Sequence, residues 1–98
     1  MSYDIDYGQH DLNITSNITP MTKVAGLYLP DLHGKSGHEG MLYVGRCLRN
    51  LTSPYSERKY KKLEAKNGWG TLEHTVSFLT HFYFIMQDNP CEIIGVHN

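Results

Sequence analysis

Residues 71–87, TLEHTVSFLTHFYFIMQ, form the most regular apolar stretch of the 98-residue chain. Apolar side chains recur every three or four positions, as on the buried face of an amphipathic helix: Leu72, Val76, Leu79, Tyr83 and Met86, with Phe78, Phe82 and Ile85 beside them. Thr71 supplies an N-cap hydroxyl. The apolar part, 76–86, contains a histidine and two hydroxyl groups and is too short for ~30 Å of hydrocarbon. It therefore predicts a core helix and no membrane anchor.

A short helix is predicted over residues 20–28. Thr19 supplies a capping hydroxyl, and Pro20 fits the first helical position because its missing N–H has no bond to lose there. Pro30 prevents the helix from continuing. The buried face is expected to contain Met21, Val24, Ala25 and Tyr28.

Ser36 and Glu39 predict the start of the next helix. They stand in the capping-box relation, in which each side chain accepts a hydrogen bond from the other residue's backbone N–H. An apolar stripe continues this helix to about Thr52. The basic segment 53–66 predicts a short, mostly solvated helix, and the glycines on both sides of Trp69 end it.

Two strands are predicted, over 11–16 from alternating polarity and over 91–96 after a proline-containing turn. The expected fold is α+β, one small domain over 1–98 with the element order β-α-α-α-α-β. Two strands do not make an independently stable sheet. Either residues 1–9 add an edge strand, or they form a poorly ordered arm and a second subunit completes the sheet. The second alternative makes a homo-oligomer the expected state.

The composition limits the classes of partner. Nine Lys and Arg against ten Asp and Glu give a net charge of −1, so no overall positive field attracts nucleic acid or an anionic membrane. Cys47 and Cys91 fall in a predicted helix and a predicted strand, and no secretory signal precedes them. They are expected to be reduced core thiols of a soluble, cytoplasmic protein. We therefore expect neither a membrane nor a nucleic acid as the partner.

The segment His33-Gly34-Lys35-Ser36-Gly37 places two glycines and a lysine at a helix start. Free N–H groups and the helix dipole favour an anion at such a position. The full phosphate-binding loop needs an earlier glycine, where Leu29 and Pro30 stand, so nucleotide hydrolysis is not indicated. The segment is a candidate anion site, and the simpler interpretation is a glycine-rich turn before a capped helix.

Short hydrogen-bonding side chains run from the first predicted strand into the next helix: Asn13, Thr15, Ser16, Asn17 and Thr19. They can surround a small polar ligand at a strand end, or they can serve only their own backbone in turns and caps. Trp69, the single tryptophan, lies between two glycines. Its indole can stack on a base or anchor a partner, or it can fill the core beneath the turn.

No pattern supports catalysis or a metal site. His33, His38 and Glu39 are the closest potential ligands, but their spacing matches no zinc pattern. His74, at the start of the last predicted helix, belongs to no nucleophile motif. The basic residues of 53–66 are interpreted as a solvated helix face. We expect a protein that is not an enzyme and uses no metal or cofactor.

Three segments carry a resemblance to other proteins: NITPM at 17–21, LHGKSG at 32–37 and NGWGTLE at 67–73. They resemble motifs of a family of short, uncharacterised phage and bacterial accessory proteins, over about Asn13 to Val96. The chain departs from that family in its longer N-terminal arm and its more basic, tyrosine-rich middle. The resemblance implies a phage protein that acts in the host cytoplasm, where it either blocks a host protein or traps a signalling nucleotide of a host defence system.

The leading hypothesis is an anti-defence protein that binds and sequesters an anionic small molecule, a nucleotide-derived signal. Lys35 and the amides after Gly34 are expected to hold phosphate. Asn17 and Thr19 are expected to orient polar groups, and Trp69 or a tyrosine to stack on a base. The remaining loop residues of the hypothetical site are His33, Ser36 and Gly37. The alternatives are a protein-binding inhibitor of a host enzyme and a hydrolase of the signal.

Overall fold

An N-terminal hairpin begins the fold in the computed structural model, which describes residues 1–98. Strand β1 (Ser2–Tyr7) pairs antiparallel with β2 (His10–Thr15), and Gly8 at φ 59° makes the turn between them. Alternate side chains of β1 are buried because successive residues of a strand point to opposite faces: Tyr3, Ile5 and Tyr7.

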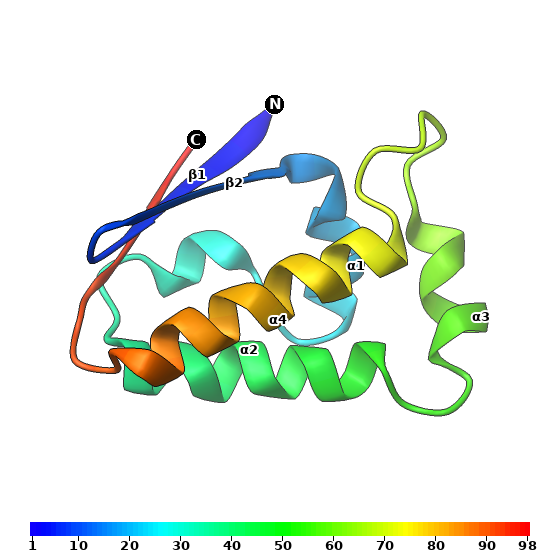
Figure 1. The fold of residues 1–98 in the computed structure, drawn as a ribbon. Helices are drawn as coiled ribbons and strands as arrows, with labels where there is room; N and C mark the ends of the chain where they lie inside the picture. Colours follow the sequence, from blue (N-terminus) through cyan, green and yellow to red (C-terminus); the bar gives the residue numbers. More distant parts are fainter.

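The third strand, β3 (Ile94–His97), pairs antiparallel with the other edge of β1, so the sheet order is β2-β1-β3. The two chain ends therefore lie together at one end of the sheet (Figure 1). Residues 1–9 add the missing strand, as one of the two alternatives predicted, but β1 occupies the centre of the sheet and not its edge. The chain supplies all three strands itself, which removes the reason for expecting a second subunit.

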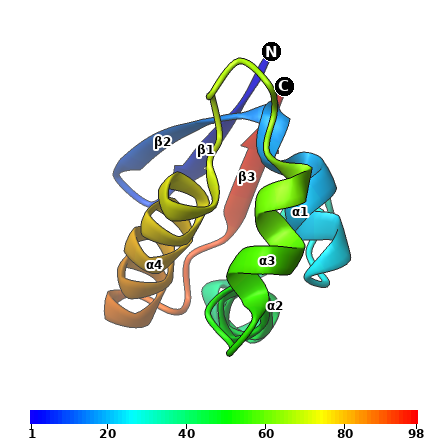
Figure 2. The same cartoon turned by 90° about the vertical axis from the view of Figure 1, so that its right-hand side faces the viewer.

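Helices α2 (Gly37–Leu51) and α4 (Leu72–Asp88) run antiparallel beneath one face of this sheet (Figures 1 and 2). Gly40 of α2 allows the close approach, because a Cβ there would lie 2.5 Å from Cδ1 of Ile94 and 2.7 Å from the sulfur of Met86. Tyr7 of β1 packs edge-on against Phe82 of α4, with ring centroids 6.2 Å apart. The layers are one sheet and one helix pair, so the α+β class is confirmed. None of the helices has the length and hydropathy that crossing a membrane requires.

Both long helices begin where the sequence predicts. The Ser36 hydroxyl accepts a hydrogen bond from the Glu39 N–H at 3.3 Å, and the Thr71 hydroxyl accepts one from the His74 N–H at 3.1 Å. The capping box at Ser36 is only half formed, because the Glu39 side chain does not bond back to the Ser36 N–H.

The first helix is shorter than predicted. Helix α1 (Thr19–Val24) ends just before Gly26, which adopts φ 99°, and the chain turns away. Val24 and Tyr28 are consequently exposed, whereas the other two residues of the predicted inner face are fully buried. Pro30 does not merely stop a helix, because it stands in the first turn of a 3₁₀ segment, Leu29–Leu32.

Thr19 is not the helix cap that the sequence suggested. The chain enters α1 through a 3₁₀ turn, Ser16–Ile18, and Thr15 caps that turn by accepting the Asn17 N–H at 3.3 Å. Thr19 is already helical, and its hydroxyl bonds to the Tyr3 hydroxyl at 2.8 Å. It thus ties α1 to the central strand.

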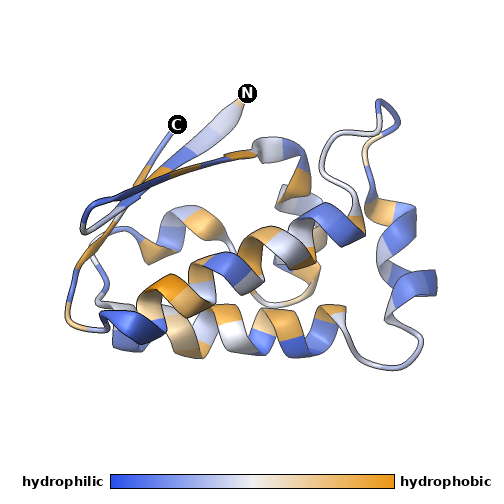
Figure 3. Ribbon diagram, viewed as in Figure 1, coloured by the Kyte–Doolittle hydropathy of each residue, from blue (hydrophilic) through white to orange (hydrophobic).

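The basic middle forms α3 (Ser56–Tyr60) and a 3₁₀ turn, Lys61–Leu63, and is mostly hydrophilic (Figure 3). Tyr60 is buried and anchors it, whereas Tyr55 is almost fully exposed at φ 70°. The segment is therefore held to the core by Tyr60 and the partly buried Leu63, and its other residues fit the predicted, mostly solvated helix.

The two cysteines differ in environment. Cys47 is completely buried on α2, and burial raises the pKa of its thiol from the ordinary value of 9.0 to about 12. Cys91 is exposed, because the closing strand begins only at Ile94 and Cys91 lies in the turn before it. The expectation of a core thiol is confirmed for Cys47 and wrong for Cys91.

Candidate functional site

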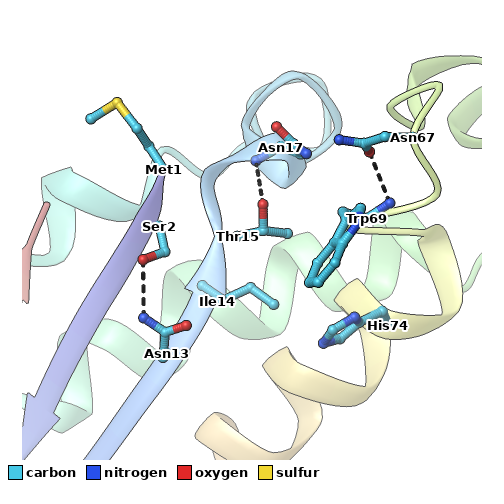
Figure 4. Close-up of a pocket in the computed structure, with 9 residues that line it drawn as sticks. All are labelled: Met1, Ser2, Asn13, Ile14, Thr15, Asn17, Asn67, Trp69 and His74. Carbon is cyan, nitrogen blue, oxygen red and sulfur yellow. Dashed lines mark hydrogen bonds between the residues drawn. The ribbon is translucent and has the colours of Figure 1, made fainter.

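A pocket of about 460 Å³ opens where the end of β2 meets the loop that precedes α4 (Figure 4). Three segments form its walls: Met1 and Ser2, the end of β2, and the loop that leads into α4, and the last two carry motifs singled out above. Ile14, Thr15 and Asn17 contribute from the strand end, and Trp69 and His74 contribute from the loop and helix. The structure therefore brings Asn17 and Trp69 into one site.

Gly70 fixes the loop against the strand end. It is buried at φ 80°, and a Cβ there would lie 3.0 Å from the γ-methyl carbons of both Ile18 and Thr15. Only glycine allows this approach without strain, in backbone conformation and in space. The Asn67 side chain accepts the Trp69 backbone N–H at 3.0 Å, which holds the tryptophan from its other side. The loop presents Trp69 from a defined position.

The Trp69 side chain is 65% exposed, so it does not fill the core. Figure 4 shows the indole directed from its loop toward Ile14 and His74. The indole N–H makes no hydrogen bond within the chain. An exposed ring with an unused donor, next to the buried side chain of Ile14, offers both a stacking surface and a directional contact.

The polar side chains of the pocket are largely unused. The carboxamide of Asn17, the amide nitrogen of Asn67 and the imidazole of His74 have no hydrogen-bond partner in the chain. Asn13 is oriented by donating to the Ser2 hydroxyl at 3.1 Å and to the Asp4 carboxylate at 2.7 Å, which leaves its carbonyl oxygen free. No Asp, Glu, Lys or Arg side chain lines the pocket.

Asn67 and His74 were not among the predicted site residues. Asn67 lies two residues before Trp69 in the segment NGWGTLE, and this proximity was an available signal. His74 follows the Thr71 cap by less than one helical turn, so its side chain lies on the loop side of α4. Its role depends on the direction in which the helix leaves the loop, which no local pattern reveals.

Thr19 does not line this pocket, because its hydroxyl is bonded to Tyr3 behind the strand end. It acts in packing, and Asn17 is the residue of that motif that faces the pocket.

The His33–Gly37 loop lies elsewhere and uses its amides within the chain. The Gly34 N–H donates to the Ile94 carbonyl at 2.8 Å, and the Gly37 N–H donates to the Glu92 carbonyl at 3.0 Å. The Lys35 N–H bonds back to Leu32 at 3.0 Å. The N–H groups of Gly34 and Gly37 therefore bind the segment that leads into β3, and these two groups are not free to bind an anion.

His33, Ser36 and Gly37 have structural partners as well. Nδ1 of His33 accepts the Val96 N–H at 3.0 Å, and the Ser36 hydroxyl caps α2. Gly37 packs against the Tyr7 ring so closely that a Cβ would overlap the phenol oxygen. Lys35 is the only residue of this loop that lines a cavity, and that cavity is separate from the Trp69 pocket.

Comparison of the chain with protein-family models, with curated proteins and with solved structures finds no match in any of the three.

Proposed function

We propose that the Trp69 pocket binds a small ligand that carries a nucleobase or a similar planar, hydrogen-bonding ring, and that the protein sequesters this ligand. The observation that carries the proposal is the 65% exposed indole, held by the Gly70 contact beside the Asn17 carboxamide and the Asn67 amide nitrogen, which have no partner in the chain. An exposed indole beside free hydrogen-bonding groups is a suitable surface for a planar, polar ligand.

The chemistry of the walls favours a base over other small molecules. Stacking of a base on an aromatic ring contributes about 1–3 kcal/mol, and it tolerates different bases. Carboxamides such as those of Asn17 and Asn67 offer a donor and an acceptor side by side, which matches the polar edge of a base. The volume, about 460 Å³, lies within the range of roughly 300–1,000 Å³ that is typical of small-ligand pockets.

Binding without turnover is favoured by the isolation of His74. It is the only imidazole that lines the pocket. Its ring bonds to no hydroxyl and no carboxylate, so no nucleophile is activated and no partner orients the imidazole. These features support sequestration over hydrolysis of the ligand.

The phage setting that the sequence resemblance implies suggests a host signalling nucleotide as the ligand. The pocket itself supplies no lysine or arginine, so a phosphate on such a ligand would extend beyond the lining residues toward solvent. Trp69 also supports a second candidate, an inhibitor of a host protein, because exposed tryptophans are enriched among the anchors of protein interfaces.

Calorimetric titration with nucleosides and nucleotides separates the two candidates. We expect saturable binding of at least one base-containing ligand, and we expect Trp69→Ala to weaken it by about 1–3 kcal/mol. Phe84→Ala is the matched control, because Phe84 is a 56% exposed aromatic side chain on α4 that does not line the pocket. Mass spectrometry of material released from the purified protein extends the search. A co-purifying host protein, with no nucleoside bound at millimolar concentration, would favour the inhibitor.

A further inference from the structure

A second pocket, of about 270 Å³, lies between α2 and the segment that follows α1. It shares no lining residue with the Trp69 pocket. Two partly exposed tyrosines, Tyr28 and Tyr43, and the side chain of Lys35 line it. Its lining therefore combines aromatic rings with a fixed positive charge, which the Trp69 pocket lacks.

Three cations gather around these two rings. The Lys35 ammonium lies 5.6 Å from the centroid of the Tyr43 ring, and the Arg46 guanidinium carbon lies 5.5 Å from the same centroid. The Lys23 ammonium lies 5.1 Å from the Tyr28 centroid. Tyr43 thus contacts two positive charges, of which Lys35 lines this pocket and Arg46 lines the neighbouring pocket on α2, as expected for cations beside an aromatic face.

None of the three cations has an anionic partner. The only ion pairs of the chain are Lys61 with Glu57 and His97 with Asp6, and both lie outside this pocket. An unpaired guanidinium and ammonium beside a cavity retain their full capacity to bind an anion. Asp31 lines this pocket and Glu39 lines the neighbouring pocket with Arg46, and neither forms an ion pair with the three cations.

Arg46 reaches from α2 across to the opposite rim. Its Nε lies 3.7 Å from the position of a Cβ on Gly26, the residue at φ 99° that ends the turn of α1. The guanidinium therefore borders the pocket beside Gly26 without being one of its lining residues, and Lys35 lines the wall beside Tyr43.

The opposite wall of the pocket suits an organic group. Leu27 and Leu32 are buried beside the Tyr28 ring, and together they form an apolar surface. The Asp31 carboxylate also lines the pocket and makes no ion pair, so it can accept a hydrogen bond from an N–H or O–H group. A plain inorganic anion would use only the cationic edge.

We propose that this pocket binds a phosphate monoester of mononucleotide size, with the phosphate between Lys35 and Arg46 and the organic ring against Tyr28 and Leu32. Asp31 accepts a hydrogen bond from an amine or hydroxyl of the organic part. The volume of about 270 Å³ limits the ligand to one ring system, below the roughly 300–1,000 Å³ of larger ligand sites. The site does not depend on the function of the Trp69 pocket.

The test uses adenosine 5′-monophosphate as the probe, with amide chemical shifts of the isotopically labelled chain as the readout at low salt. We expect saturable shifts over residues 26–35 and 43–46. Lys35→Gln and Arg46→Gln should each weaken the affinity by about tenfold or more, as expected for hydrogen bonds to charged groups. The loss should diminish as salt screens the site. Adenosine and inorganic phosphate separately should bind more weakly at these residues.

Lys59→Gln is the matched control, because the Lys59 ammonium lies 5.4 Å from the centroid of the Tyr60 ring and neither residue lines this pocket. It should leave the affinity unchanged, and Trp69→Ala should leave the shifts over 26–35 unchanged. The proposal is overturned if Lys35→Gln and Arg46→Gln bind the nucleotide as tightly as Lys59→Gln does. It is also overturned if the saturable shifts are confined to the residues around Trp69.

Discussion

Gly70 shows how one residue without a side chain assembles a site. Gly68 and Gly70 have almost the same positive φ, 79° and 80°, but nothing lies within 4 Å of a Cβ at Gly68. At Gly70 the Cβ would press on Ile18 and Thr15 at 3.0 Å. A side chain at Gly68 would cost only backbone strain, whereas one at Gly70 would also displace packed atoms. The close packing at Gly70 is what holds the Trp69 loop in place.

We expect Gly68→Ala to lower the free energy of unfolding by about 1 kcal/mol, the cost of a left-handed L-residue. Gly70→Ala should lower it by about 2–4 kcal/mol, because overpacking adds to the same strain. Denaturant unfolding of both variants measures the difference. Equal losses would show that the loop does not rest on the strand end as described.

The two cysteines give a second prediction at this scale. A thiol reagent such as dithionitrobenzoate should modify one cysteine in the native protein, Cys91, and both after unfolding. Burial raises the pKa of Cys47 to about 12 from 9.0, so the folded state retains the thiol proton where the unfolded chain loses it. The stability from this difference is complete below pH 9 and is lost as the pH rises toward 12. Rapid modification of both thiols in the native state would contradict the packing of α2.

At the scale of the element, local signals predicted most of the structure and long-range pairing was the missing part. The starts of α2 and α4 followed from Ser36 and Thr71, whose hydroxyls bond amides three residues ahead. The end of α1 was missed because Gly26 follows two apolar residues that fit a helical stripe equally well. The central position of β1 was missed because strand order depends on which distant segments pair, and alternation alone does not specify neighbours.

Ile5 tests the central strand. Its side chain is 1% exposed between β2 and β3, so Ile5→Ala should lower the free energy of unfolding by about 2–5 kcal/mol. Ile93→Ala is the matched control, because Ile93 is 56% exposed, and it should change stability by less than about 0.5 kcal/mol. Similar melting curves for the two variants would mean that residues 1–9 do not join the core.

Ser36 tests the helix start. Ser36→Ala removes the acceptor for the Glu39 N–H and should lower the free energy of unfolding by about 1 kcal/mol. Glu39→Ala should lower it by only about 0.3–0.5 kcal/mol, since the Glu39 side chain makes no capping bond and contributes through the helix dipole alone. A larger loss for Glu39→Ala than for Ser36→Ala would reverse this assignment.

At the scale of the whole molecule, the fold redistributes the motifs that the sequence presented as one set. The Asn17 and Trp69 motifs meet at one pocket because Gly70 docks the second onto the first. The glycine-rich loop before α2 donates the N–H groups of Gly34 and Gly37 to the segment leading into β3. Lys35 alone faces a cavity, through its side chain. The spacing of residues in the sequence predicts neither the meeting of the Asn17 and Trp69 motifs nor the contact of the glycine-rich loop with the segment before β3. Both depend on contacts between segments far apart in the chain.

Fluorescence titration of Trp69 tests the central claim most directly, because it is the only tryptophan and reports on the pocket alone. Stacking of a base on the indole should quench the emission in a saturable way with at least one of the common nucleosides or nucleotides. Asn17→Ala should weaken that affinity roughly threefold to tenfold, the effect of losing a neutral hydrogen bond, while leaving the emission of the ligand-free protein unchanged. Quenching that increases linearly without saturation for every base, and equally in Asn17→Ala, would contradict a base-binding site at Trp69.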